Sequence, residues 1–298
     1  MANITTTEVA QVIPVIVASQ TLGALASNMA LLGIVNRDYD SDVAQYGQSV
    51  KIGKRGALSV NDKAANTNVT RQTPSHTAVT VTLNKHKEVT IAAEDLAIMF
   101  SRPDVIAGYA EDAAIALLEA IEGDLAGLYS GLSQTIDATS GLGDDDFREG
   151  QRLLNSAKAP LSNRWAVLHE DAYKEAEGLD KLINADYQGS DAFAAVQAGM
   201  LGRYAGFNIL LDQNIKVAST QCKNLFLHRN ALVLATRPMR QTQRRNVEQV
   251  VQSENGIGLR VTMSYDANML AEQMTIDMLY GVAELRDDHG VVVSTAEV

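Results

Sequence analysis

The acidic residues, the histidines and the single cysteine are the side chains of this chain that could do chemistry. Asp144, Asp145 and Asp146 follow a glycine turn and could bind a hard cation. The segment lacks the alternating ligands, the central glycine and the terminal glutamate of a helix-loop-helix calcium site. We therefore interpret the three aspartates as an acidic helix N-terminus, where carboxylates are favoured by the helix dipole.

A second candidate is the run of His169, Glu170 and Asp171, which places an acid beside a base. Because successive helical residues point in different directions, the three side chains are not expected to converge on one atom. A helix start again explains them. Cys222 is the only cysteine, which excludes an internal disulfide and any multi-cysteine zinc site, and no nucleophile signature surrounds it.

The remaining candidates lack the spacing that their chemistry requires. His76, His86 and His289 do not form a two-histidine zinc motif. The glycines between Gly199 and Gly206 match neither the dinucleotide-binding fingerprint nor the P-loop. The sequence therefore predicts no catalytic residue, no bound cofactor and no metal ion.

The elements that would carry these residues begin with two segments that need a partner surface. Residues 1–46 are rich in Thr, Ala, Ser and Asn without a core-forming period, which is typical of an extended arm that reaches beyond its own subunit. Residues 47–93 alternate apolar and polar residues on both sides of a polar segment, and this pattern predicts a two-stranded hairpin. Such a hairpin is marginally stable alone in water, so something must cover it.

A long helix is predicted from about 102 to 133. Ser101 is an N-cap candidate, Pro103 suits the first turn, and apolar residues then recur at steps of three or four. At about 1.5 Å per residue the helix would be roughly 45 Å long. Gly123 and Gly127 lie on one face and weaken the helix unless another segment packs closely there.

The rest of the chain predicts a mixed, compact α+β region followed by long strands. Helical and strand-like patterns alternate after residue 143. No segment reaches the roughly 18 to 20 uninterrupted apolar residues of a membrane span, and the apolar run near the N-terminus is interrupted by Pro14. The predicted helices are 146–157 and 170–177, and the predicted strands are 164–168, 207–211, 259–263, 275–282 and 291–293.

Charge is segregated along the chain. The net charge of -11 argues against a surface that binds nucleic acid throughout. Residues 103–147 contain acidic residues but no Lys, Arg or His, whereas the hairpin is net positive. We predict that the hairpin of one subunit lies across the acidic helix of its neighbour; two solvated faces are the alternative. The predicted inter-subunit residues are Lys51, Lys54, Arg55, Lys85, Lys87, Glu111, Asp112, Glu119 and Glu122.

This order of arm, basic hairpin, acidic helix, mixed region and returning strands resembles the Hong Kong 97-type major capsid proteins of tailed bacteriophages, and within them the podovirus-type coat branch. Ile34 to Tyr39, followed by Gly47 to Val50, resembles the start of the family's E-loop. Gly199 to Ile209 resembles its axial-domain glycine segment, and Leu225 to Ala235 and Asp277 to Gly281 also resemble family segments.

The resemblance implies the Hong Kong 97-type fold with four parts. These are the N-terminal arm at 1–46, the E-loop hairpin at 47–93, a peripheral domain at 94–142 and 236–298 that contains the spine helix, and an axial domain at 143–235.

The resemblance also implies a function without enzymatic activity. It implies a major capsid protein that assembles in the host cytoplasm into the pentamers and hexamers of an icosahedral head, the virion capsid, and encloses double-stranded DNA without sequence-specific binding. Its implied partners are further copies of itself, a scaffolding protein, a portal protein and, optionally, a cement protein, with no membrane. An encapsulin-like compartment is the alternative, and a soluble enzyme is a distant one.

Overall fold

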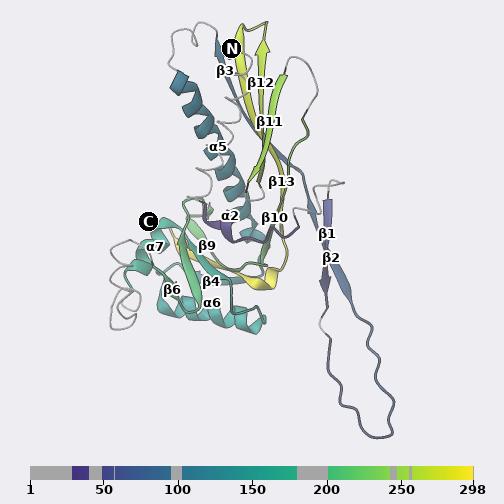
Figure 1. Ribbon diagram of the computed structural model, residues 1–298. Helices are drawn as coiled ribbons and strands as arrows, with labels where there is room; N and C mark the ends of the chain where they lie inside the picture. Colours follow the sequence, from purple (N-terminus) through teal and green to yellow (C-terminus); the bar gives the residue numbers. More distant parts are fainter. Residues whose placement is uncertain are drawn as a thin grey trace, which may run out of the picture.

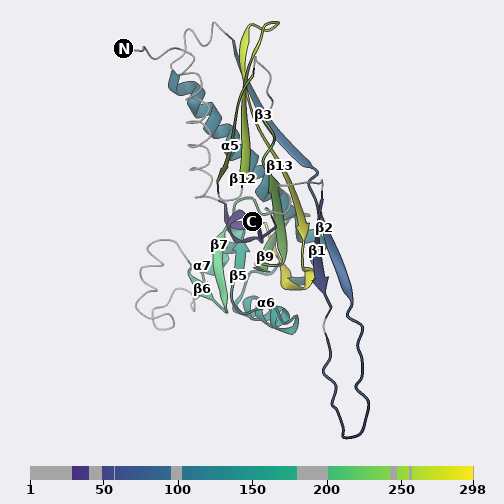
Figure 2. The same cartoon turned by 45° about the vertical axis from the view of Figure 1, so that its right-hand side comes forward.

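The computed structural model describes residues 29–39, 49–56, 58–94, 103–179, 201–241, 247–254 and 257–297. Two sheets form the body, and a long hairpin projects away from it (Figures 1 and 2). None of the helices in these ranges is both long and apolar enough to cross a membrane.

The first sheet is antiparallel and centres on β13 (Ala271–Glu284), which is 14 residues long. β13 pairs with β10 (Leu232–Arg237), with β12 (Ile257–Asp266) and with β3 (Lys85–Glu94), and β12 pairs with β11 (Val247–Glu254). Along β12 the buried Leu259 and Val261 alternate with the partly exposed Arg260 and Thr262, as the sequence pattern predicts, whereas β13 buries the three residues 276–278 in succession. The predicted C-terminal strands at 259–263 and 275–282 are confirmed.

Helix α5 (Pro103–Ala126) lies along this sheet (Figure 1). Leu117, Ile121 and Leu125 are buried at steps of four and belong to the same core as the apolar residues of β12 and β13. The helix is shorter than the predicted 102–133, because the chain tightens into a 3-10 helix over Gly127–Gly131. The N-terminal cap predicted at Ser101 lies outside the described residues.

The second sheet has seven strands and mixed direction. In order they are β4 (Gln134–Ala138), β14 (Gly290–Ala296), β9 (Gln221–His228), β5 (Arg164–Leu168), β7 (Phe207–Leu211) and β6 (Arg203–Tyr204), and β8 (Val217–Ala218) pairs with β9. Helices α6 (Asp144–Ser156) and α7 (Glu170–Glu177) belong to this lobe. Three stacked or tilted rings, Phe147, Phe207 and Phe226, occupy its core at centroid distances of 5.1 and 5.0 Å.

Strand pairing divides the chain differently from the predicted domain boundaries. β4 and β14 lie within the segments assigned to the peripheral domain, yet both pair into the seven-stranded sheet. β10 begins inside the predicted axial segment, yet pairs with β13 in the first sheet. The chain passes from one sheet to the other at turns. The spacing of apolar residues along the sequence does not show where these crossings occur.

The projecting hairpin consists of β1 (Ser49–Arg55) and β2 (His76–Thr82), paired from Ser49 with Thr82 to Arg55 with His76. The predicted range of 47–93 is wrong at its end, because β3 leaves the hairpin and pairs with β13. Ile52 and Val81 pack with Leu285 in a small core of their own, so the base of the hairpin is fixed to its own chain.

Gly281 makes this attachment possible, because a Cβ there would lie 2.3 Å from Thr82 O. We expect Gly281→Ala to destabilise the chain by about 1–3 kcal/mol, since the clash is with backbone that cannot rotate away. Gly53→Ala is the control, because nothing lies within 4 Å of its Cβ position. Urea midpoints measure the effect, and equal losses at both positions would contradict it.

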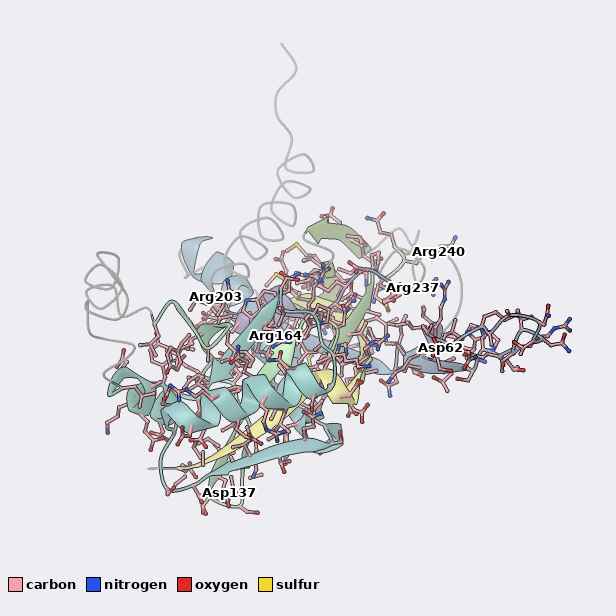
Figure 3. All side chains as sticks on the ribbon, turned by 90° about the horizontal axis from the view of Figure 1, so that it is seen from below. Asp62, Asp137, Arg164, Arg203, Arg237 and Arg240 are labelled. Carbon is pink, nitrogen blue, oxygen red and sulfur yellow. The ribbon has the colours of Figure 1, made fainter. Side chains whose placement is uncertain are left out.

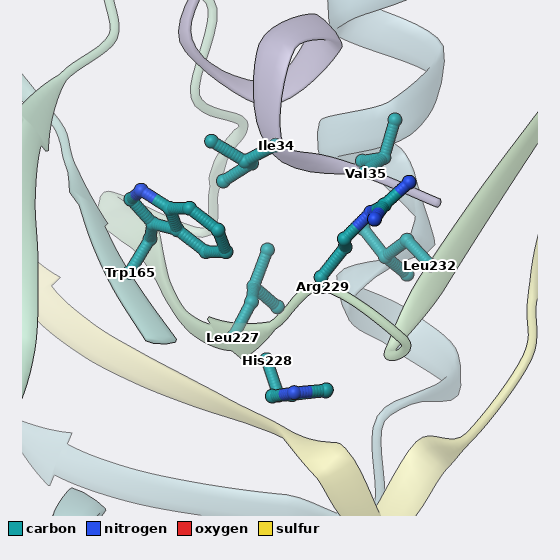
Figure 4. A pocket seen from close by; sticks show the side chains of 7 residues that line it. All are labelled: Ile34, Val35, Trp165, Leu227, His228, Arg229 and Leu232. Atoms are coloured by element: carbon teal, nitrogen blue, oxygen red, sulfur yellow. The ribbon is translucent and has the colours of Figure 1, made fainter. Parts of the chain in front are cut away.

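Residues 29–39 contain the short helix α2 (Ala30–Ile34) and pack on their own chain. Asn36 forms a parallel bridge with Val233, and its backbone bonds to Leu232 O and Leu234 N at 3.1 and 3.0 Å. Figure 4 shows Ile34 facing Trp165 above Leu227, with Val35 on the side of Leu232. The prediction that residues 1–46 reach beyond their own subunit is therefore wrong for 29–39, and 1–28 lie outside the described residues.

Candidate functional site

The basic hairpin and the acidic helix are partly neutralised within one chain. Lys85 Nζ lies 2.9 Å from Asp124 Oδ1, and Lys54 Nζ lies 3.9 Å from Asp288 Oδ1. Tyr280 also donates to Asp124 Oδ2 at 2.6 Å. Partial burial acts to raise the pKa of Asp124, but the hydrogen bonds from Tyr280 and Lys85 outweigh it and lower the pKa. Lys54 and Lys85 thus have partners in their own subunit.

Glu122 cannot serve as an inter-subunit residue, which corrects that part of the prediction. Its side chain is fully buried, and its two carboxylate oxygens accept hydrogen bonds from Leu31 N at 2.5 Å and Leu32 N at 3.0 Å. Glu122 therefore holds the first turn of α2 against α5. Burial, followed by the nearby charge of Asp212, raises the pKa of Glu122 to about 8.

The other predicted residues stay on the surface. Lys51, Arg55 and Lys87 are exposed on the hairpin and on β3. On α5 the exposed positions recur at steps of three and four. Asp112 and Glu119 are two of these positions, and together they form the acidic stripe. The side chain of Glu111 lies outside the described part. The structure of one chain brings none of these exposed basic groups onto the exposed stripe, so the predicted contact would need a second copy.

Beyond Gly56 the hairpin continues as the projecting loop, residues 58–75. Its arms form no strand ladder in the described structure, and Gly56 N to Ser75 O at 2.8 Å is the bond at its base. Val60 is 96% exposed and Leu58 66%. Figure 3 shows Asp62 on the hairpin side of the molecule, apart from Arg164 in the body. Within the loop the Gln72 side chain bonds to the backbone of Ser59. Arms without a strand ladder and with exposed apolar groups are typical of a segment that pairs with another chain.

The two acidic clusters that the sequence singles out both lie at helix starts, but one of them has a further neighbour. Asp144 to Asp146 do begin α6, and Asp146 accepts from Gly143 N at 2.8 Å, which confirms the helix-start interpretation. His169 is likewise the N-cap of α7 and accepts from Asp171 N at 3.4 Å. The helix-start interpretation of His169 did not include Cys222. Strand β9 brings Cys222 beside His169 and Asp171 from more than fifty positions away in the sequence.

The cluster of Cys222, His169 and Asp171 does not have the geometry of a nucleophilic triad. A triad places nucleophile and carboxylate on opposite ring nitrogens of the histidine. Here Cys222 Sγ lies 3.3 Å and Asp171 Oδ2 3.4 Å from the same atom, His169 Nδ1. Burial, and then the charge of Asp171, raise the pKa of the Cys222 thiol to about 11, so the thiolate is scarce at neutral pH.

A second buried polar group was also missed by sequence reasoning. Asp277 is 2% exposed and accepts two hydrogen bonds from the Arg260 guanidinium, at 2.9 and 2.5 Å, and its Oδ2 lies 2.8 Å from His86 Nε2, within hydrogen-bonding distance. It ties β3, β12 and β13 together. The Arg260 and Asp277 positions alternate with core residues, and no local signal marks them as partners.

Comparison with known proteins gives the class of this fold. The sequence matches no protein-family model and no curated protein. It is similar to a structure from Mycobacterium phage Che8 with a TM-score of 0.68 and 20% identity, over 89% of this chain and 91% of that chain. It is also similar to the capsid of the cyanophage P-SCSP1u, with a TM-score of 0.66, 14% identity and coverage of 92% and 90%.

The mature capsid of bacteriophage PhiM1 is a third similar structure, with a TM-score of 0.61, 12% identity and coverage of 86% and 84%. The identities are low, so these similarities concern the fold. The chain has the Hong Kong 97-type fold of phage capsid proteins, as the sequence resemblance implies.

Proposed function

We propose that this chain is the major capsid protein of a tailed bacteriophage. Fold alone does not fix function. The observation that carries the proposal is the projecting loop: residues 58–75 extend from the body with exposed apolar side chains and no strand ladder between the two arms, an arrangement that a second subunit would complete. The agreement over about nine tenths of the chain with phage capsid structures supports the same conclusion.

The finer proposal is that copies form the pentamers and hexamers of an icosahedral head that encloses double-stranded DNA. Closed symmetric shells result when many identical weak contacts repeat. This proposal includes assembly in the host cytoplasm, on a scaffolding protein and around a portal. It also includes an optional cement protein. The net charge of -11 suits a shell that encloses DNA without binding it, because like charges repel.

Electron microscopy of the purified chain tests the proposal, first with the chain expressed alone and then with the scaffold encoded beside it. Closed icosahedral shells, or free pentamers and hexamers, are the expected result. Only monomers or dimers under both conditions would contradict it. Shells that contain an enzyme cargo and no portal would indicate an encapsulin-like compartment instead.

The proposed subunit contact joins Lys51 and Arg55 of one copy to the acidic stripe of Asp112 and Glu119 on its neighbour. Exposed ion pairs are each worth about 0.2–1 kcal/mol, yet every subunit would repeat them, so reversal should strongly reduce assembly. We expect the double variant Lys51→Glu, Arg55→Glu to assemble poorly, and Asp112→Lys, Glu119→Lys in the same chain to restore shells.

Shell yield after sedimentation measures this contact, with Lys158→Glu as the control charge reversal away from both surfaces. The salt dependence of assembly is a second measurement, because screening weakens exposed pairs. Assembly of the first double variant at the parental level, or no rescue by the second pair, would show that the two charged surfaces are solvated faces.

A further inference from the structure

Three possible metal ligands meet where α7 begins beside β9. Cys222 Sγ lies 3.3 Å from His169 Nδ1 and 3.9 Å from Asp171 Oδ2, and the last two atoms are 3.4 Å apart. Each residue supplies one ligand atom to the same small volume. Strands β5 and β9 fix the cluster, since His169 follows β5 directly and Cys222 lies in β9.

The three separations are close to those of a tetrahedral zinc site. Bonds of about 2.3 Å to sulfur and about 2.0–2.1 Å to nitrogen or oxygen, at about 109°, separate the ligand atoms by roughly 3.3–3.6 Å. Two of the observed distances fall in this range, and the third exceeds it by a few tenths of an ångström, which a small side-chain rotation removes.

We propose that Cys222, His169 and Asp171 bind a single zinc ion, or a divalent cation of the same softness, with the fourth position open to solvent. Thiolate and imidazole ligands together favour zinc over the oxygen-binding calcium and magnesium ions. Cys222 is fully buried while the Asp171 side chain is 21% exposed, so the site opens on one side only. The proposal does not depend on assembly into a shell.

Surrounding groups hold the ligands in place. Asn224 is fully buried, and its Oδ1 accepts from His169 N at 2.7 Å. Its Nδ2 donates to Thr295 Oγ1 at 2.9 Å and to Val293 O at 3.2 Å, and Thr295 is the residue of β14 that lies opposite Cys222 in the sheet. A network that fixes two ligands at once is the kind of outer shell that metal sites require.

The charge beside the sulfur also favours a cation. The Asp171 carboxylate lies 3.9 Å from Cys222 Sγ, and Glu170 precedes Asp171 in the chain, so a bound cation would have negative groups next to it. A metal ion would displace the 3.4 Å contact from Asp171 N to His169 Nδ1, which is long for a hydrogen bond.

Titration of the purified full chain with Co²⁺ tests the site directly. Because Cys222 is the only cysteine, a cobalt–thiolate charge-transfer band can come from no other residue. We expect that band together with the visible absorption of tetrahedral cobalt, at one ion per chain, and displacement of both by Zn²⁺.

Substitutions separate a built site from a lone thiol that happens to bind cobalt. Cys222→Ser should abolish the charge-transfer band. His169→Asn and Asp171→Asn should weaken cobalt binding by more than the roughly 10- to 100-fold that loss of an outer-shell partner costs. Asparagine at 169 can still cap α7, so folding should persist, and circular dichroism checks this. The exposed His76→Asn is the matched control and should bind like the parent.

Two results would overturn the proposal. One is a folded parent chain that gives no charge-transfer band at saturating cobalt. The other is an unchanged band and affinity in His169→Asn and Asp171→Asn, which would mean that the sulfur binds metal without the other two ligands.

Discussion

A chain in which residues 57–74 are replaced by an Asn-Gly turn is expected to fold like the parent and to form no closed shells. Gly56 N and Ser75 O are already paired at 2.8 Å, so a two-residue turn can close the ladder there. The side chains that are removed contact little of their own chain, since Val60, Leu58 and Val69 are 96%, 66% and 69% exposed. We expect the free energy of unfolding to change by about 0.5 kcal/mol or less.

The expected loss of assembly follows from the same geometry. Each arm of the hairpin and projecting loop spans some sixteen residues, which at about 3.3 Å per residue reaches roughly 50 Å from the body. No other described segment could replace a contact at that distance. Sedimentation and electron microscopy measure the yield of shells, and urea unfolding of the free subunit measures its stability.

A full-length control distinguishes the reach of the loop from its apolar side chains. The variant Leu58→Ser, Val60→Ser, Val69→Ser keeps the length and removes apolar area. A partial loss of shells in this control with a complete loss in the shortened chain would support contact through both backbone and side chains. Shells of normal size and yield from the shortened chain would contradict the proposed role of the loop.

Replacement of Glu122 should have the largest effect on the stability of the subunit itself. Glu122→Ala leaves the N–H groups of Leu31 and Leu32 buried without an acceptor. An unsatisfied buried donor costs about 1–3 kcal/mol, and the cavity adds to this, so we expect a loss of about 3 kcal/mol or more. Glu122→Gln keeps an acceptor and removes the charge, so its loss should be much smaller.

The pH dependence of this contact has a definite sign. The pKa of Glu122 rises from 4.5 to about 8 on folding, chiefly through burial and then through the charge of Asp212, the carboxyl that faces it from the segment after β7. Burial likewise raises the pKa of Asp212, and the charge of His169 acts in the opposite direction. The folded state binds the proton more tightly, so the stabilisation is complete below about pH 4.5 and is lost as the pH rises through about 8.

Urea unfolding at several pH values, followed by fluorescence, measures both effects. Trp165 is the only tryptophan and faces Ile34 of α2, so its emission reports the docking of α2 (Figure 4). We expect the parent to lose stability relative to Glu122→Gln from pH 5 to pH 8, by at most about 1.4 kcal/mol per pH unit. Glu119→Gln, three residues earlier on the exposed face, should show no such difference. Parallel pH profiles for parent and Glu122→Gln would contradict this role of the carboxyl.

Most of the local structure could be predicted from the sequence, because it depends on neighbours a few residues apart. The helical period of α5, the alternation of apolar and polar residues in β12 and the acidic start of α6 can each be recognised within a short segment of sequence. The resemblance in the order of parts gave the capsid fold correctly. The exposed basic hairpin and the acidic stripe were also visible as charge patterns.

The tertiary structure alone decided which distant segments meet. Glu122 continues the buried row of Ala114, Leu118 and Ala126 at steps of four, but its partners, the N–H groups of α2, come from a distant segment. Lys85 belongs to the hairpin by composition but pairs with Asp124. Cys222 and His169 are 53 positions apart and meet only because β5 and β9 are adjacent. Sequence patterns fix periodicity, and therefore which face of an element is buried, whereas partner choice depends on long-range pairing that no local spacing records.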